Sequence, residues 1–221
     1  MVIAGSKNKI STPQFIYFSL FFSLLSSEII IEEDEAWGSI EINKLLPHKI
    51  ELELEQQFRL DDNFQNIYKI FTDVSLSYPL HSLVDIAGKF RFIIADDEKE
   101  KRYGISIKVD PFDKFYIPSY KIKIQQDYNH DDEPENLVIR NKFTFNFPKL
   151  NSFKPNIYYE SYHTYEDEGF EYDKFRLSAG VDYIINSYYS VEFFYIYKGK
   201  IKEEKIDEVT NIMGLKFEYT F

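Results

Sequence analysis

Apolar and polar side chains alternate along residues 49–221 of this chain. In the first segment, Leu52 and Leu54 fall on one face of an extended strand, while Glu51 and Glu53 fall on the other. Side chains of a β-strand point alternately to its two faces, so a period of two predicts strands. Ten such segments follow one another and no helical period interrupts them. The chain is therefore expected to be all-β.

The length and the two faces of these segments favour a membrane barrel. Each runs for roughly 8–13 residues, whereas strands of soluble proteins average about 5–6 and tilted membrane strands need about 9–11. One face is aliphatic and aromatic and the other is charged, and a soluble sandwich would have to bury 21 Phe and 18 Tyr in one core. Backbone groups in lipid must all be paired, so the sheet has to close. We therefore expect a transmembrane antiparallel up-and-down β-barrel.

Parity indicates the number of strands. Ten segments, five in each direction, allow the first to close against the last in antiparallel fashion. An eleventh candidate, Trp37–Leu45, would run parallel to the last strand, so it is expected at the edge, inside the lumen or at the periplasmic rim. Twelve strands are the alternative, if one more is hidden in a region that resembles a loop.

The N-terminal 27 residues have the three parts of a secretory signal peptide. Lys7 and Lys9 form a basic start, Phe15–Leu25 an uncharged apolar core, and Ser26 and Ser27 a small-residue end. The core is shorter than the roughly 20 residues that span a bilayer as a helix. The expected organisation is a signal peptide over residues 1–27, an N-terminal segment over 28–48 and the barrel domain over 49–221.

Connections between the segments alternate in length and charge. The longer ones are acidic, for example Asp96–Lys101 and Asn129–Asn136, and the shorter ones include Pro79–Ser82. Bacterial barrels have short periplasmic turns and longer external loops, so we expect the acidic connections outside. Pro111–Ser119 is long for a turn and fits this scheme least well.

Overall charge and composition exclude several function classes. The chain carries 26 basic and 37 acidic residues, a net charge of −11, whereas a nucleic-acid binder needs a basic footprint. It has no cysteine, which excludes disulfide scaffolds and thiolate metal sites. We expect no cofactor, no metal and no nucleic-acid partner. The expected partners are outer-membrane lipid and the barrel assembly machinery, with the protein as a monomer.

Several short motifs, taken in order, resemble the outer-membrane barrel family filed as domain of unknown function 2490. They are Trp37, Glu55-Gln-Gln-Phe-Arg59, Gly88-Lys-Phe-Arg91, Leu137-Val-Ile-Arg-Asn-Lys142, Pro155-Asn-Ile-Tyr-Tyr-Glu160 and Arg176-Leu-Ser-Ala-Gly-Val-Asp-Tyr183. Where that family usually shows a second arginine on the fifth and sixth strands, this chain has Lys108, Lys121 and Lys123, which keep the charge but lose the bidentate geometry. The resemblance implies a fold and an outer-membrane location, and no catalytic residues.

The polar face supplies the candidate functional residues. The charges expected to line the lumen are Glu51, Glu53, Glu55, Arg59, Lys89, Arg91, Arg102, Lys108, Lys121, Lys123, Arg140, Lys142, Glu160 and Arg176. Lumen charges must pair or stay hydrated, so they predict either a plugged, salt-bridged interior or a narrow pore whose basic wall favours anions. A last strand ending in Phe217, Tyr219 and Phe221 resembles the signal by which outer-membrane barrels are recognised for assembly.

No convincing catalytic constellation is present. His130 beside Asp131 and Asp132 could act as a general base on an external loop, but a solvated acidic loop is favoured, and His163 is expected in an aromatic belt with its neighbouring tyrosines. The expected function is an outer-membrane protein that is structural or a narrow channel. The alternatives are a cell-surface binding protein using its acidic external loops, and a soluble exported barrel with an apolar ligand among inward-facing aromatic rings.

Overall fold

The computed structural model describes residues 31–61, 66–95, 98–111, 117–166, 169–202 and 205–221. They form eleven strands and one 3-10 turn: β1 (Ile31–Leu45), η1 (Pro47–Lys49), β2 (Glu51–Asp61), β3 (Asn66–His81), β4 (Val84–Ala95), β5 (Glu98–Val109), β6 (Ser119–Tyr128), β7 (Pro134–Asn146), β8 (Phe153–Glu166), β9 (Gly169–Ile184), β10 (Tyr189–Lys202) and β11 (Lys205–Thr220). Within these ranges no helix has the length and apolar character needed to cross a membrane. The predicted signal peptide lies outside the described residues.

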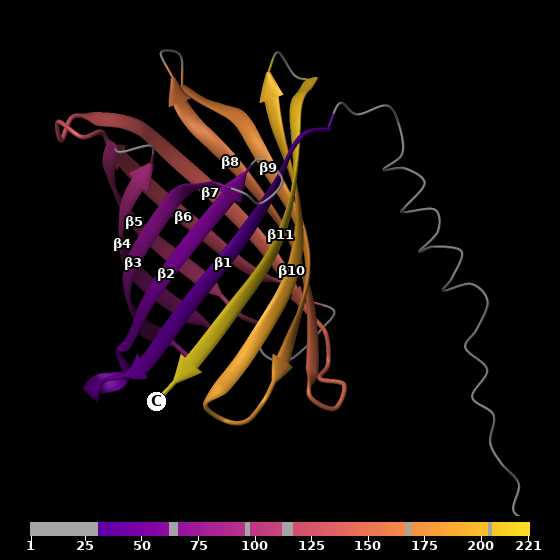
Figure 1. Ribbon diagram of the computed structural model, residues 1–221. Coiled ribbons are helices and arrows are strands. Elements are labelled where there is room, and N and C mark those ends of the chain that lie inside the picture. The colour runs from indigo at the N-terminus through magenta and orange to yellow at the C-terminus, as the bar shows by residue number, and fades with distance from the viewer. Residues whose placement is uncertain (1–30, 62–65, 96–97, 112–116, 167–168, 203–204) are drawn as a thin grey trace, which may run out of the picture. The chain divides into compact units, whose positions relative to one another are not determined.

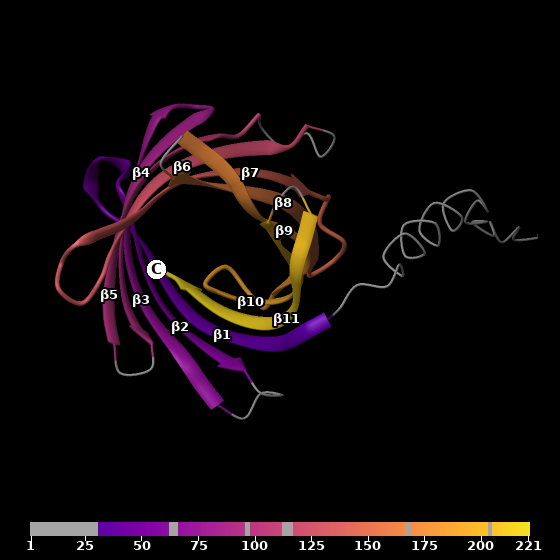
Figure 2. The same cartoon turned by 90° about the horizontal axis from the view of Figure 1, so that it is seen from above.

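The strands form one closed barrel (Figure 1). Each strand pairs with its neighbours in the sequence, and β1 pairs with β11 to complete the ring. The view from above, in Figure 2, shows β1 and β11 side by side in that ring. The ten pairings between consecutive strands are antiparallel, whereas the β1–β11 pairing is parallel. Closure leaves no free sheet edge along the described strands.

The expected all-β barrel is confirmed, with eleven strands rather than about ten. The parity argument was wrong because it required antiparallel closure. A parallel pair also exchanges backbone hydrogen bonds. After a register shift between Ile31 and Glu33, β1 pairs continuously with β11 from Glu33↔Thr210 to Asn43↔Thr220. On its other side β1 pairs with β2 from Ala36↔Leu60 to Leu45↔Glu51. Residues 37–45 thus belong to the barrel wall, and not to an edge, the lumen or a rim.

Apolar side chains cover the outer face of the barrel. Exposed examples come from many strands and include Ile40, Leu76, Ile105, Ile124, Phe193 and Leu215; Ile105 is 64% exposed. The buried residues on the inner face are mostly polar or charged, such as Glu41, Asp73, Gln125 and Glu160. The strand alternation is thus satisfied with its apolar side outward and its charged side inward.

Aromatic rings gather on the outer face near both ends of the barrel. At the C-terminal rim, defined as the end where β1 and β11 finish, Tyr189 stacks on Tyr219 at 4.9 Å between ring centroids and Tyr219 stacks on Phe221 at 5.3 Å. At the N-terminal rim, where β1 and β11 begin, Tyr165 packs on Phe170 at 5.3 Å. His163 lies in this second group, at 5.4 Å from the ring of Tyr172.

The predicted difference in connection length is wrong. Strands at the N-terminal rim continue into the stretches predicted as long loops, so that β6 ends at Tyr128 and β7 already begins at Pro134. In the hairpin formed by β8 and β9, Glu166 likewise pairs directly with Gly169, so the strands extend through most of the stretch predicted as a loop. Backbone pairing between antiparallel neighbours does not need the apolar face, and polar segments can therefore extend a hairpin. The acidic residues still lie at this rim.

Candidate functional site

The inner face of the barrel encloses two cavities. The larger, of about 800 Å³, is lined from residues near the N-terminal rim down to Glu55, Gln125 and Lys142. The smaller, of about 170 Å³, lies towards the C-terminal rim and is lined by residues that include Glu53, Lys121 and Lys123. Arg91, Arg140 and Lys142 line both cavities, so the two meet at these side chains.

Twelve of the fourteen predicted lumen charges line these cavities. They are Glu53, Glu55, Arg59, Lys89, Arg91, Arg102, Lys121, Lys123, Arg140, Lys142, Glu160 and Arg176. The other two lie nearer the C-terminal rim: Glu51 is exposed, and the Lys108 ammonium pairs with Asp110 at 2.9 Å. The structure therefore brings nearly all of the predicted residues into one continuous space.

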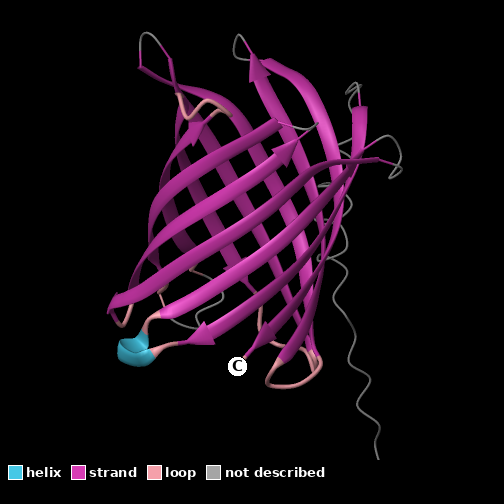
Figure 3. Ribbon diagram, turned by 60° about the vertical axis from the view of Figure 1, so that its left-hand side comes forward, coloured by secondary structure: helices cyan, strands magenta, loops and turns pink. Residues whose placement is uncertain are grey.

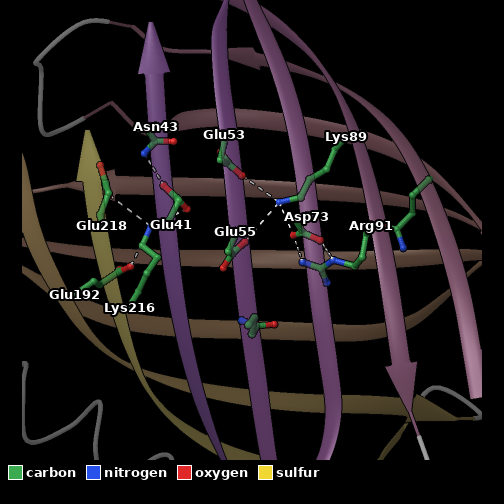
Figure 4. Close-up of polar contacts among 12 residues, drawn as sticks. Glu41, Asn43, Glu53, Glu55, Asp73, Lys89, Arg91, Glu192, Lys216 and Glu218 are labelled. Atoms are coloured by element: carbon green, nitrogen blue, oxygen red, sulfur yellow. Dashed lines mark hydrogen bonds and ion pairs between the residues drawn. The ribbon is translucent and has the colours of Figure 1, made fainter. Parts of the chain in front are cut away.

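One side of the lumen is a wall of closely spaced ion pairs, which we call the paired wall; it is the inner face of β11, β1, β2, β3 and β4 (Figure 4). Lys89 lies 2.8 Å from Asp73, 3.2 Å from Glu53 and 3.7 Å from Glu55. Arg91 donates two hydrogen bonds to Asp73, each of 2.6 Å. Asp73 is only 1% exposed, so its charge is compensated by direct contacts and not by bulk water.

Lys216 supplies the second centre of the paired wall. Its ammonium lies 3.4 Å from Glu41, 3.7 Å from Glu218 and 3.9 Å from Glu192, and Figure 4 shows these side chains converging on it. Carboxylate oxygens of Glu41, Glu53 and Glu55 approach within 4.8 Å of one another. Lys216 and Lys89 contact members of this trio, so ammonium groups already supply its countercharge.

A layer of arginine and aromatic groups crosses the larger cavity. The Arg59 guanidinium lies between the rings of Trp37 and Phe71, at 3.8 and 4.2 Å from their centroids. Arg176 lies 5.1 Å from the same Trp37 ring. Cations over aromatic faces are attracted by the ring quadrupole, so these contacts stabilise the two guanidinium groups. They matter most for Arg59, which forms no ion pair with a carboxylate of the described residues.

Glu35 links β1 to side chains of β3 and β10 inside the lumen. Its carboxylate accepts hydrogen bonds from Trp37 Nε1 at 2.7 Å and Tyr68 Oη at 2.6 Å, and lies 3.0 Å from Lys198 Nζ. The period-two pattern of this strand predicts Tyr68 on the apolar face together with Ile70 and Val74, which is wrong, because Tyr68 lines the larger cavity. A register shift between Arg59 and Leu60, opposite Lys69 and Ile67, changes the alternation there and turns Tyr68 inward.

The opposite side of the lumen carries fewer acids. Glu160 is 5% exposed and accepts hydrogen bonds from Arg140 and from the Tyr162 hydroxyl, each at 2.7 Å. Arg102 is paired to Asp127 through two hydrogen bonds of 2.5 and 2.6 Å. These arginines are therefore neutralised in the same way as those of the paired wall.

Three lysines on this side differ from these arginines because they form no ion pair with a described residue. Lys121 and Lys123 on β6 and Lys142 on β7 line the smaller cavity. Within the described part of the chain, no carboxylate lies within 4.0 Å of their ammonium groups. The Lys142 ammonium lies 3.7 Å above the ring of Tyr158. We call the inner face of β6 and β7 that bears these three side chains the lysine wall.

The rim residues considered for catalysis form surface ion pairs. His130 Nε2 lies 3.0 Å from Asp131, and both side chains are well exposed. Asp132 instead accepts a hydrogen bond from Lys101, which raises the pKa of that lysine. Phe217, Tyr219 and Phe221, the residues of the predicted assembly signal, lie at the end of the chain on the outer face.

Some lumen residues were not singled out from the sequence. Glu35 and Glu41 are absent from the predicted lumen charges because their strand is expected outside the barrel wall, although with Trp37 they continue the same alternation, with Ala36, Gly38 and Ile40 on the other face. The signal that could have found them is this continuation of the period-two pattern through residues 35–43.

A family of proteins matches most of the described chain. A family model described as "Protein of unknown function (DUF2490)" matches residues 34–204, from within β1 to the end of the β10 region. A search of curated proteins finds no match. The family match covers nearly all of the lumen residues described above.

Proposed function

The chain belongs to the DUF2490 family of proteins of unknown function, and we propose that it is an outer-membrane β-barrel whose charged lumen is a narrow pore for small ions. The observation that carries the proposal is the reversal of the usual protein surface: apolar side chains cover the outside of a closed barrel and ion pairs fill the inside.

The outer face supports the membrane location. Soluble monomers rarely expose continuous apolar patches larger than a few hundred Å², and here exposed Ile, Leu, Val, Phe and Tyr side chains occur on all eleven strands. Aromatic groups at both ends, such as Tyr189 with Tyr219 and Tyr165 with Phe170, match the girdles that membrane barrels place at the two interfaces. Closure of the sheet satisfies the backbone groups that lipid cannot.

The lumen supports conduction over a purely structural role. The two cavities meet at Arg91, Arg140 and Lys142, and charged side chains line both. Rings of charged side chains are the means by which pores select small ions. The polar lining also argues against the alternative of an apolar ligand held inside a soluble barrel. Such a ligand needs aromatic side chains in the lumen, and most of the described aromatic side chains lie on the outer face.

The orientation follows from the proposed assembly signal. With Phe221 on the periplasmic side, the C-terminal rim faces the periplasm and the acidic N-terminal rim faces outward. In this arrangement β1 begins at the external rim, because it runs parallel to β11. The barrel assembly machinery and outer-membrane lipid are then its partners, and no oligomeric contact is needed for closure.

Two measurements test the two parts of the proposal. Fractionation of cells that express the full chain should recover it with the outer membrane, extractable only by detergent and with heat-modifiable gel mobility. Recovery as a soluble monomer without detergent would overturn the location.

Conduction is tested with the purified barrel in planar lipid bilayers. Discrete, small conductance steps are expected, with the heat-unfolded chain as the control that gives none. A correctly folded barrel that inserts but gives no steps would overturn the pore and leave a structural barrel.

A further inference from the structure

We propose that the lysine wall is a binding site for a small multivalent oxyanion of the phosphate class. The inference deepens the proposed function by naming the class of ion that binds in the lumen. A role of this site in ion passage rests on the proposed pore. The binding itself rests only on the geometry of the barrel interior.

The strand register places like charges side by side on this wall. Lys121 on β6 is the direct partner of Lys108 on β5 and of Lys142 on β7. Lys123 is the direct partner of Arg140. Direct partners have Cβ atoms about 4.5–5.5 Å apart, and like charges at that separation repel. Lys121 therefore has a base on each side, which disfavours the barrel unless an anion is bound there.

The smaller cavity carries a surplus of positive charge. Its lining holds six cationic side chains, Lys89, Arg91, Lys121, Lys123, Arg140 and Lys142, against two carboxylates, those of Glu53 and Glu160. Lys89 and Arg91 are also paired with Asp73, so the surplus of positive charge resides in the three lysines. The Glu53 carboxylate is already bonded to Lys89 and that of Glu160 to Arg140. Glu160 is also the direct partner of Lys142, whereas Lys121 and Lys123 have no carboxylate as a direct partner on either neighbouring strand.

The position of Lys123 depends on the absence of a side chain at Gly104, its diagonal neighbour on β5. A Cβ added to Gly104 on β5 would lie 2.5 Å from Lys123 Cε and 3.3 Å from Lys123 Nζ. The lysine chain thus lies flat across Gly104, with its ammonium held against the wall. Any residue larger than glycine would push this ammonium away from its present place.

The rest of the lining indicates the class of ligand. The hydroxyl groups of Ser75 and Ser106 are its uncharged donors, and none of the described residues that line the smaller cavity is aliphatic or aromatic. A volume of about 170 Å³ equals on the order of five waters. Lysines act as point charges without the fixed fork of arginine, which suits a compact tetrahedral oxyanion better than a planar carboxylate. A free phosphate or the phosphate group of a larger ester would satisfy this chemistry.

Titration calorimetry of the full-length barrel, folded in a zwitterionic detergent at low ionic strength, tests the site. Inorganic phosphate is expected to bind with one site per chain. Lys123→Gln should weaken this binding at least tenfold. Lys69→Gln is the matched control, because Lys69 lines the larger cavity and the same charge is lost there; it should change the affinity less than twofold.

Gly104→Ala separates a shaped site from a general effect of charge. It leaves the net charge unchanged but displaces Lys123, so a loss of phosphate affinity similar to that of Lys123→Gln is expected. Heat-modifiable mobility establishes that each variant is folded. Equal weakening by Lys69→Gln and Lys123→Gln, or no binding of phosphate to the folded wild type, would overturn the proposal.

Two further comparisons distinguish free phosphate from a phosphate ester as the ligand, and failure of the binding site from failure of the proposed pore. Glycerol 3-phosphate binding more tightly than inorganic phosphate would assign the site to an ester, and the reverse order to the free ion. Phosphate binding without conductance steps would contradict the pore and leave the site intact. Conductance without phosphate binding would contradict the site and leave the pore intact.

Discussion

The two walls of the lumen both carry basic side chains, and they differ in whether the strand register places an acid beside each base. In one row across the paired wall and its continuation, successive partners are Glu55, Asp73, Arg91, Arg102 and Asp127. Each base in this row has an acid beside it. In the row through the lysine wall, successive partners are Asp85, Lys108, Lys121, Lys142 and Glu160, so Lys121 has no acid beside it.

This difference separates structural charges from functional ones. Removing one member of a buried, hydrogen-bonded ion pair leaves the other charge buried without a partner, which lowers the stability of the fold. Unpaired like charges do the opposite and are retained at a cost in stability. The paired wall should therefore lose stability when it is mutated, and the lysine wall should lose ligand binding and gain stability.

The largest effect is expected on the paired wall. Asp73→Ala leaves Lys89 and Arg91 without their shared carboxylate, and it should lower the free energy of unfolding by about 3–5 kcal/mol. Urea titration of the folded barrel in detergent, followed by gel mobility, measures this change. Asp131→Ala on the exposed rim is the control and should stay within about 0.5 kcal/mol of the wild type. Equal effects of the two substitutions would contradict the distinction between the lumen and the rim.

A smaller loss is expected where β1 is anchored. Trp37→Leu removes the ring beneath Arg59 and Arg176 and the donor to Glu35, and it should destabilise the barrel by about 1–3 kcal/mol. Trp37→Phe keeps a ring face and loses only the N–H group, so it should fall between the wild type and Trp37→Leu in the same urea titration. Unchanged stability in Trp37→Leu would mean that β1 is held by its backbone pairing alone.

The smallest effect has the opposite sign. Lys121→Gln relieves repulsion from Lys108 and Lys142 and should stabilise the phosphate-free barrel by about 0.2–1 kcal/mol. Lys89→Gln is the matched substitution on the paired wall, where Lys89 has three carboxylates within 3.7 Å, and it should destabilise. The same sign for both lysines would remove the difference between the walls.

The sequence predicts the composition of the lumen well and its pairing poorly. Alternation alone identifies which face each side chain takes, because the strand period is two, and twelve predicted charges accordingly line the cavities. It does not reveal that Lys121 has Lys142 beside it, because that depends on the register between strands. Nor does it reveal the register shift that turns Tyr68 inward.

The number of strands was missed for a different reason. Glu35, Trp37 and Glu41 continue the period-two pattern, but antiparallel closure admits only an even number of strands and therefore excludes this one. The structure closes through a parallel pair that includes Trp37↔Gly214. Gly214 leaves room there for the Phe194 ring, which would lie 1.9 Å from an added Cβ and which packs edge-on to Trp37.

Fluorescence quenching in lipid vesicles tests the central claim most directly, namely that the ring-bearing side of the sheet meets hydrocarbon. Trp37 is the sole tryptophan and lies inside, so a Trp37→Phe background with Ile105→Trp moves the reporter to the exposed outer face. Brominated lipid tails should quench the fluorescence of the Ile105→Trp variant strongly and that of the wild type weakly. Strong quenching of the variant by aqueous iodide, with no effect of brominated lipid, would contradict the account.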